Sequence, residues 1–140
     1  MYRLVYKSRS KTKIDLELVN SILESSQKGN TDSGISGALL ATRQYFLQIL
    51  EGSFEDVNKL YSSIVKDSRH DEVQLISFTC IENRIFESWT MHGIGVFDLN
   101  LELSRQLKDS YGEEHGEVCF PTEEWKVLAM IHDIRRATGK

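Results

Sequence analysis

The sequence predicts an α+β fold: a ferredoxin-like β-α-β-β-α-β-β sheet with two helices on one face, plus two C-terminal helices. Three observations predict it. The length of 140 residues is that of one ordinary domain. The composition, 40% hydrophobic and 27% charged, is typical of globular chains. Along the first 97 residues, the hydrophobic period switches between that of strands and that of helices.

The first half of the chain contains an expected strand, a helix and a hairpin. Residues 3–8 form the β-prone opening strand. A helix with Thr12 as its expected N-cap follows, and the breaker cluster 29–34 ends it near residue 28. Two strands, 35–41 and 45–50, are close enough for a hairpin. The apolar stripe of the helix consists of Leu16, Val19, Ile22 and Leu23.

The second half of this region repeats the pattern. Ser53 with Asp56 is a capping signature for a helix that ends about Asp67. Residues 73–81 and 89–97 are the expected fourth and fifth strands. Right-handed crossovers place both helices on the same face of the sheet, and the groove between them suits a flat ligand.

The composition changes after residue 97, where two more helices are expected. Residue 122, a threonine, is the expected N-cap of the last one. We expect these helices to pack on the open face of the sheet or on a partner. The apolar positions are Leu99, Leu103, Leu107 and Tyr111 in one helix and Trp125, Leu128, Ile131 and His132 in the other.

Charge and motif content exclude several classes of protein. A net charge of −4 argues against nucleic-acid binding by phosphate neutralisation. No apolar run is long enough to span a membrane, and no signal peptide is apparent, so we expect a cytoplasmic protein. Cys80 and Cys119 lack the spacing of metal ligands or a disulfide framework and are expected to be reduced, buried side chains. Without a phosphate loop or nucleophile triad, an enzyme is not expected.

Three polar side chains form a candidate site. Tyr6 and Gln48 lie on strands that are neighbours in this fold, and Asn30 at the end of the first helix can reach the same region. Buried polar groups must bond to one another or to a ligand. A phenol, a glutamine and an asparagine suit the edge of a heteroaromatic ring. The alternative is that Tyr6 and Gln48 are ordinary sheet residues.

Several stretches, in this order and at this spacing, resemble the BLUF family of flavin-binding blue-light sensors. They are RLVY at 3–6, Asn30 with GISGALL at 34–40, FLQILEG at 46–52, DSRH at 67–70 and FESWTM at 86–91. The resemblance covers residues 1–97, which we expect to form the flavin-binding domain. Residues 98–140 would then be a helical extension.

The resemblance implies a role for each matching residue. It implies FAD as cofactor, with FMN or riboflavin as alternatives. Relatives often have a polar residue where this chain has Gly29, and some have an arginine in place of Ser63. The implied photoactive relay is Tyr6, Gln48, Trp89 and Met91, and the implied flavin contacts are Asn30, Gln48, Ile22, Ile64, Asp67, Arg69 and His70.

The resemblance also implies a mechanism. Under blue light, Tyr6 would give an electron to the flavin and a proton would follow through Gln48, whose amide ends rotated or tautomerised. The change would pass through Met91 and Trp89 to the last strand and the helices after it. The output would be contact with a downstream signalling protein, in a homo-oligomer. The alternatives are a light-insensitive binding module or an acylphosphatase-like hydrolase that uses Arg9.

Overall fold

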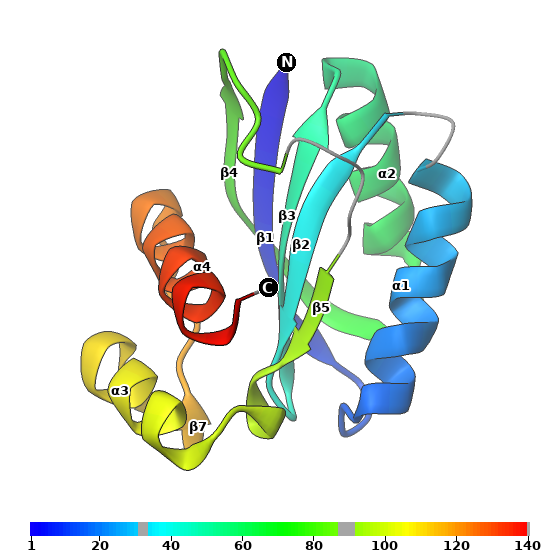
Figure 1. Ribbon diagram of the computed structural model, residues 1–140. Helices are drawn as coiled ribbons and strands as arrows, with labels where there is room; N and C mark the ends of the chain where they lie inside the picture. Colours follow the sequence, from blue (N-terminus) through cyan, green and yellow to red (C-terminus); the bar gives the residue numbers. More distant parts are fainter. Residues whose placement is uncertain (31–33, 87–91, 140) are drawn as a thin grey trace.

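The computed structural model describes residues 1–30, 34–86 and 92–139, with the side chains of 25–30, 92–94 and 98 outside the description. A five-stranded sheet lies between two layers of helices, with α1 and α2 on one face and α3 and α4 on the other (Figure 1). The α+β, ferredoxin-like prediction is confirmed. The elements are β1 Tyr2–Ser10, α1 Leu16–Asn30, β2 Ser36–Ala41, β3 Tyr45–Gly52, α2 Phe54–Lys66, β4 His70–Cys80, β5 His92–Gly95, the 3-10 turn η1 Val96–Asp98, α3 Leu101–Tyr111, β6 Glu113–Glu114, β7 Glu117–Val118 and α4 Glu124–Thr138.

The strand order of the sheet is β4-β1-β3-β2-β5. β1 is antiparallel to both β3 and β4, β2 is antiparallel to β3, and β5 is parallel to β2. Each of the β1-α1-β2 and β3-α2-β4 units therefore connects two parallel strands with a third strand between them, which is the split arrangement of this fold. Of the predicted strand 89–97, residues 92–95 are β5, and residues 89–91 lie outside the described part.

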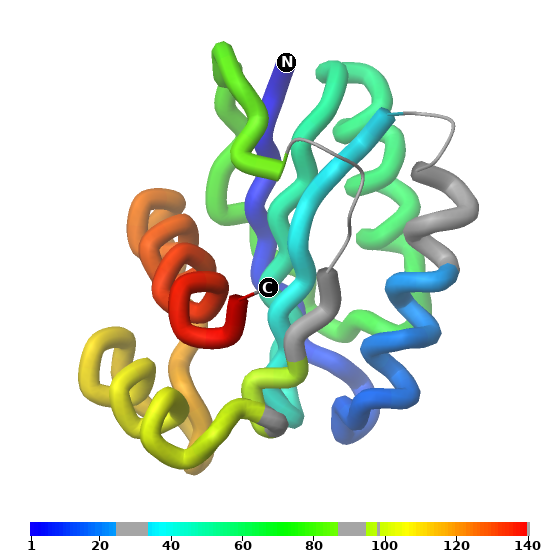
Figure 2. The backbone as a smooth tube through the Cα atoms, viewed as in Figure 1, coloured from blue at the N-terminus to red at the C-terminus, as the bar shows by residue number. Residues whose placement is uncertain are grey.

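Alternating residues of the central strands belong to two separate hydrophobic cores, one on each face of the sheet. Leu4 and Leu50 face α1 and α2, whereas Val5, Leu47 and Ile49 face α4, as the two-residue period of a strand requires. As predicted, the C-terminal helices pack on the open face of the sheet. Figure 2 shows the red C-terminal helix beside the sheet, with the yellow α3 next to it. The buried residues of α4 are Val127, Met130, Ile131 and Ile134.

Two of the predicted helix caps are wrong. The side chain of Asp15, not that of Thr12, accepts a hydrogen bond from the Leu18 N–H at 2.8 Å. An N-cap must directly precede its helix, and α1 begins only at residue 16. Glu123, not residue 122, holds the N-cap position of α4, and it makes no side-chain cap. The predicted Ser53 cap of α2 is confirmed, since its hydroxyl accepts from the Asp56 N–H at 3.2 Å.

The buried face of α4 and the start of α3 also differ from the prediction. Trp125 is 64% exposed and His132 is exposed. Leu99 ends the 3-10 turn, and α3 begins after the Asn100 cap. The polar break before α4 contains the β6–β7 hairpin, which strand patterns missed because each strand has only two residues.

The two cysteines are free, but Cys80 is exposed on β4 rather than buried, and Cys119 is half-buried.

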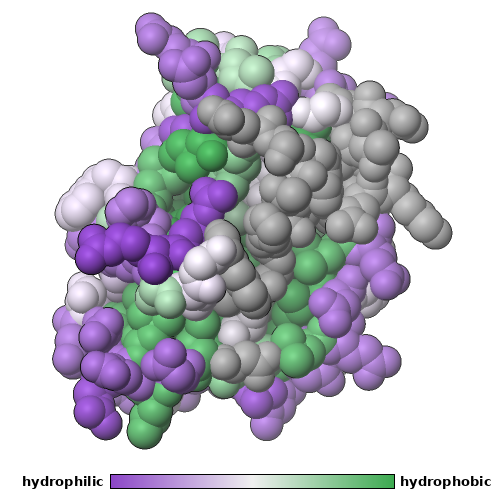
Figure 3. Space-filling view, viewed as in Figure 1, coloured by the Kyte–Doolittle hydropathy of each residue, from purple (hydrophilic) through white to green (hydrophobic). Residues whose placement is uncertain are grey.

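Figure 3 shows hydrophobic surface at the α3 end of the molecule, where Leu101 is 76% exposed. Within the described residues, no helix combines the length and apolarity needed to cross a bilayer. The same residues contain no group of three or more His, Cys, Asp or Glu side chains placed to hold a metal ion.

Candidate functional site

Tyr6 and Gln48 meet at the centre of the sheet. They are direct cross-strand partners on β1 and β3, and each is 1% exposed. The Tyr6 hydroxyl donates a hydrogen bond to Gln48 Oε1. The pair lies on the face covered by α1 and α2, among the apolar side chains of that core. The structure therefore brings together the phenol and the amide that the sequence predicted to be neighbours.

Burial keeps the Tyr6 phenol protonated. It raises the pKa of Tyr6 far above its ordinary value, and the nearby Tyr61 and Asp67 raise this pKa further, while Arg69 acts against them. The Tyr61 ring lies beside the phenol, with ring centroids 5.8 Å apart. In this environment the proton stays on the Tyr6 oxygen and is directed at Gln48.

A cavity of about 160 Å³ opens between α1 and α2 above this pair. Ile22 of α1 and Ile64 of α2 form apolar walls, and Gln48 and Tyr6 lie at its floor. Ligand sites usually measure roughly 300–1,000 Å³, so this cavity is smaller than a usual ligand site. The complete lining is Tyr6, Ile22, Gln48, Leu60, Ser63, Ile64, Asp67, Arg69 and His70.

An ion pair stands at the edge of the cavity, at the end of α2. Arg69 Nη2 lies 2.6 Å from Asp67 Oδ2, and Arg69 Nε lies 3.0 Å from Asp67 Oδ1. The backbone N–H of Arg69 also donates to this carboxylate, at 2.8 Å. The pairing lowers the pKa of Asp67 and raises that of Arg69, so both groups are charged at neutral pH. They supply polar contacts at the mouth of an apolar slot.

His70 closes the floor beside this ion pair. It is 8% exposed, and its Nδ1 lies 2.7 Å from the Ser8 hydroxyl oxygen on β1. Burial lowers the pKa of His70, with Arg69 acting in the same direction and Asp67 against it. The imidazole is therefore neutral near pH 7.

These residues fit a flat heteroaromatic cofactor such as the isoalloxazine ring of a flavin. Two apolar walls suit the faces of a ring, and a carboxamide offers both a donor and an acceptor to its polar edge. Charged groups at the mouth suit polar substituents that reach toward solvent.

Three of the predicted site residues cannot be placed against the cavity. Asn30 is the last residue of α1, but its side chain lies outside the described part, and Trp89 and Met91 fall within the undescribed 87–91. Sequence reasoning missed Leu60 as a lining residue. Its place one helical turn before Ile64 on the stripe of α2 was the available signal. Ser63, noted as a departure from the family, also lines the cavity.

Comparison with known proteins agrees with this geometry. The family model described as BLUF, sensors of blue-light using FAD, matches residues 1–92. The chain is 31% identical over 85 residues to photoactivated adenylate cyclase subunit beta of Euglena gracilis, covering 60% of this chain and 10% of that protein. It is 28% identical over 99 residues to the blue light- and temperature-regulated antirepressor BluF of Escherichia coli strain K12, covering 70% of this chain and 24% of that one. The chain thus spans a quarter or less of these relatives.

Solved structures show the same fold. A bacterial light-regulated adenylyl cyclase aligns with 99% of this chain and 36% of its own, with a TM-score of 0.70 and 28% identity. The dark-state structure of BlrB, a BLUF protein, aligns with 97% of this chain and 96% of its own, with a TM-score of 0.75 and 24% identity. At that identity the second match shows the fold alone.

The fold, the slot between two helices and these matches define the class as that of flavin-binding photosensor domains. The chain belongs to the BLUF family, the sensors of blue light that use FAD.

Proposed function

We propose that this chain detects blue light through a flavin held non-covalently between α1 and α2, with Tyr6 and Gln48 as the relay. The observation that carries the proposal is the buried hydrogen bond from Tyr6 to Gln48 at the floor of the cavity. Ile22 and Ile64 would sandwich the ring, and Asn30 would hold its carbonyl and imide side. Asp67, Arg69 and His70 would contact its far edge and the arm that leads toward the phosphate.

The bound flavin, when illuminated, supplies an electron acceptor. Tyr6 is the donor in our proposal, because its phenol lies at the cavity floor. Its raised pKa keeps the proton on the oxygen in the dark, and the hydrogen bond leads this proton to Gln48 Oε1 when the electron leaves. A carboxamide is an acceptor at one end and a donor at the other. Rotation or tautomerisation of Gln48 would therefore change which group it offers to the ring edge.

The family description names FAD, and we propose FAD as the bound form, with FMN and riboflavin as the alternatives. All three carry the same ring, and the described lining residues surround the ring space. Arg69 lines this space, with its guanidinium paired to Asp67.

We further propose a sensor without catalytic activity that signals by protein contact. Residues 1–97 would bind the flavin and 98–140 would be the output extension, with Trp89 and Met91 carrying the change between them. Relatives of this domain are named as a cyclase and an antirepressor, so related domains work with different effectors. A cytoplasmic location, a homo-oligomer and a separate signalling partner remain predictions.

The acylphosphatase-like alternative is less well supported. Its anion loop would have to present Arg9, whose guanidinium is paired with Asp71 at 2.5 Å. A light-insensitive binding module is the other alternative, and flavin spectroscopy separates it from the sensor.

The decisive experiment is to illuminate the purified, flavin-loaded protein. We expect a reversible red shift of the flavin absorption. Tyr6→Phe should retain flavin and lose the shift, since the phenol oxygen is the proton source, and Gln48→Ala should also lose it. Asn30→Ala should weaken flavin retention more than either.

Tyr61→Phe is the matched control, because this tyrosine lies beside Tyr6 but on α2. It should keep the shift. A normal light response in Tyr6→Phe would reject the relay, and a purified protein that takes up no flavin would support one of the alternatives.

A further inference from the structure

A buried carboxylate lies on β3 opposite the flavin face. Glu51 is 0% exposed and follows Gln48 by three residues, so its side chain projects from the other side of the strand. Glu51 Oε2 accepts from Arg3 Nε at 2.9 Å and pairs with Arg3 Nη2 at 2.9 Å. Arg3 is its direct cross-strand partner on β1. Two nitrogens of the Arg3 guanidinium thus contact one carboxylate oxygen, which leaves Oε1 for other donors.

The second oxygen of Glu51 holds a different part of the chain. Oε1 accepts from the backbone N–H groups of Ile85 and Phe86, both at 2.9 Å. Arg84 Nη1 donates to the Ser36 hydroxyl at 2.7 Å and to the backbone carbonyl of Glu51 at 3.1 Å. Residues 84–86, which we name the 84–86 anchor, are therefore bound to β3 immediately before residues 87–91.

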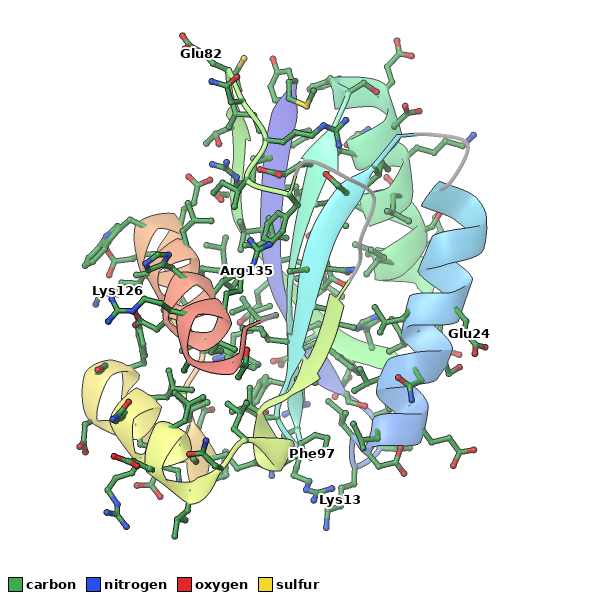
Figure 4. All side chains as sticks on the ribbon, in the orientation of Figure 1. Lys13, Glu24, Glu82, Phe97, Lys126 and Arg135 are labelled. Atoms are coloured by element: carbon green, nitrogen blue, oxygen red, sulfur yellow. The ribbon has the colours of Figure 1, made fainter. Side chains whose placement is uncertain are left out.

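Two residues of α4 contact groups that are themselves bound to the Glu51 carboxylate. Arg3 Nη1 lies 3.6 Å from Oε1 of Glu124, the first residue of the helix. Near the other end, the Arg135 guanidinium carbon lies 5.0 Å from the centre of the Phe86 ring. Figure 4 shows Arg135 reaching from α4 toward the sheet, whereas Lys126 on the same helix points away. Glu51 is therefore linked to the start of α4 through Arg3 and to its later part through Phe86.

We propose that Glu51 is a positioning residue that couples β3 to α4. It fixes the 84–86 anchor and, through Arg3 and Phe86, the two ends of the helix. A displacement of β3 at Gln48 is transmitted to α4 on the opposite face of the sheet. The light-dependent part of this inference rests on the proposed function, whereas the positioning of the anchor does not.

The test is amide hydrogen exchange on the full chain carrying Glu51→Gln, with and without flavin, in the dark and under blue light. The neutral amide is a weaker acceptor and turns a donor group toward Arg3. Exchange at Ile85 and Phe86 should therefore rise about tenfold even without flavin. The absorption red shift should remain, because Tyr6 and Gln48 lie on the other face. The light-induced change in exchange along α4 should be largely lost.

Glu124→Gln is the matched control, because it removes only the outer partner of Arg3. It should leave exchange at Ile85 and Phe86 unchanged and reduce the light response at the start of α4. If Glu51→Gln fails to fold, Arg3→Lys tests the same point. It keeps the charge but loses the planar fork, so exchange at Ile85 and Phe86 should rise less.

Parental exchange at Ile85 and Phe86 in folded Glu51→Gln, or in Arg3→Lys, would overturn the positioning role. A parental light response of α4 in Glu51→Gln would overturn the coupling. The absence of any red shift in the unsubstituted protein would instead defeat the proposed function, and exchange at Ile85 and Phe86 would still decide the role of Glu51.

Discussion

The two faces of the sheet differ in how their side chains are packed. On the α1/α2 face, a cavity of about 160 Å³ remains above a hydrogen-bonded phenol and amide. On the α4 face, apolar side chains from the sheet and α4 fill the core, and charged groups are paired inside it. The cavity beside Tyr6 and Gln48 lies on the first face, and the buried Arg3–Glu51 ion pair lies on the second. The cavity and the paired charges therefore lie on opposite faces of the same strands.

Consecutive residues of β1 show this division most clearly. Tyr6 faces the cavity, whereas Lys7 points to the other side, where Nζ lies 3.4 Å from the carbonyl oxygen of Phe120 and 3.6 Å from Glu114. The same ammonium group lies 4.6 Å from the centre of the Tyr45 ring. One strand thus carries the tyrosine of the proposed relay on one face and contacts the segment before α4 on the other.

The largest expected effect comes from comparing isoleucines on the two faces. Ile49→Ala removes a fully buried side chain from the filled α4 face and should cost about 2–5 kcal/mol of unfolding free energy. Ile22→Ala should cost less in flavin-free protein, because its side chain already borders a void. Denaturant unfolding without and with flavin measures both. Equal costs in the flavin-free state would contradict the difference in packing.

The next effect concerns pH and the floor of the cavity. Because burial lowers the pKa of His70 in the folded state, the unfolded chain binds a proton first as the pH falls below about 6.5. Stability should therefore decrease from that pH down to the lowered folded pKa, and His70→Asn should reduce the decrease. Urea unfolding at several pH values checks this. His132→Asn, at an exposed position of α4, should keep the parental pH dependence.

A smaller effect is expected where α3 joins α4. The Tyr111 hydroxyl donates to Asp133 at 2.7 Å on the surface between these helices. Tyr111→Phe removes one partly exposed hydrogen bond and should cost about 0.5–1 kcal/mol of unfolding free energy. Thermal unfolding measures it. A loss of unfolding free energy as large as that of Ile49→Ala would contradict this prediction. It would mean that the contact between α3 and α4 stabilises the fold more than one surface hydrogen bond can.

The smallest effect is expected at Trp125. This side chain is 64% exposed, so Trp125→Ala should change the unfolding free energy by no more than about 0.5 kcal/mol. The same denaturant titration checks it. A clear loss of stability at low protein concentration would show that the indole is buried in the folded protein in solution.

The sequence was sufficient to locate strands β1 to β4 and the central pair of the site. Two-residue and 3.6-residue periods located most elements, and their order determined that β1 and β3 are neighbours. The meeting of Tyr6 and Gln48 followed from that order. The apolar cavity walls, Ile22 and Ile64, lie on the helix stripes that periodicity revealed.

Local patterns failed where tertiary packing decides. Thr12 and Asp15 are both good capping residues, and Asp15 is the cap because the helix begins at residue 16. Which side of α4 faces the sheet is set by tertiary packing, and in this fold Val127 is on the buried side and Trp125 on the exposed side. No pattern could pair Glu51 with the 84–86 anchor, because these contacts join residues 34 and 35 positions apart through backbone N–H groups.

The interior position of β1, between β4 and β3, affects how the protein folds during synthesis. This strand precedes the other strands of the sheet in the chain, has buried residues on both faces, and pairs with β3 and β4, which are synthesised later. Until then its unpaired backbone N–H and C=O groups and its apolar side chains are exposed, and they can associate with other chains. Substitutions in β1 should therefore strongly affect the need for chaperones and the formation of inclusion bodies. Because the proposed flavin site needs β1 paired with β3, yellow colour in expressing cells would report that this pairing has formed.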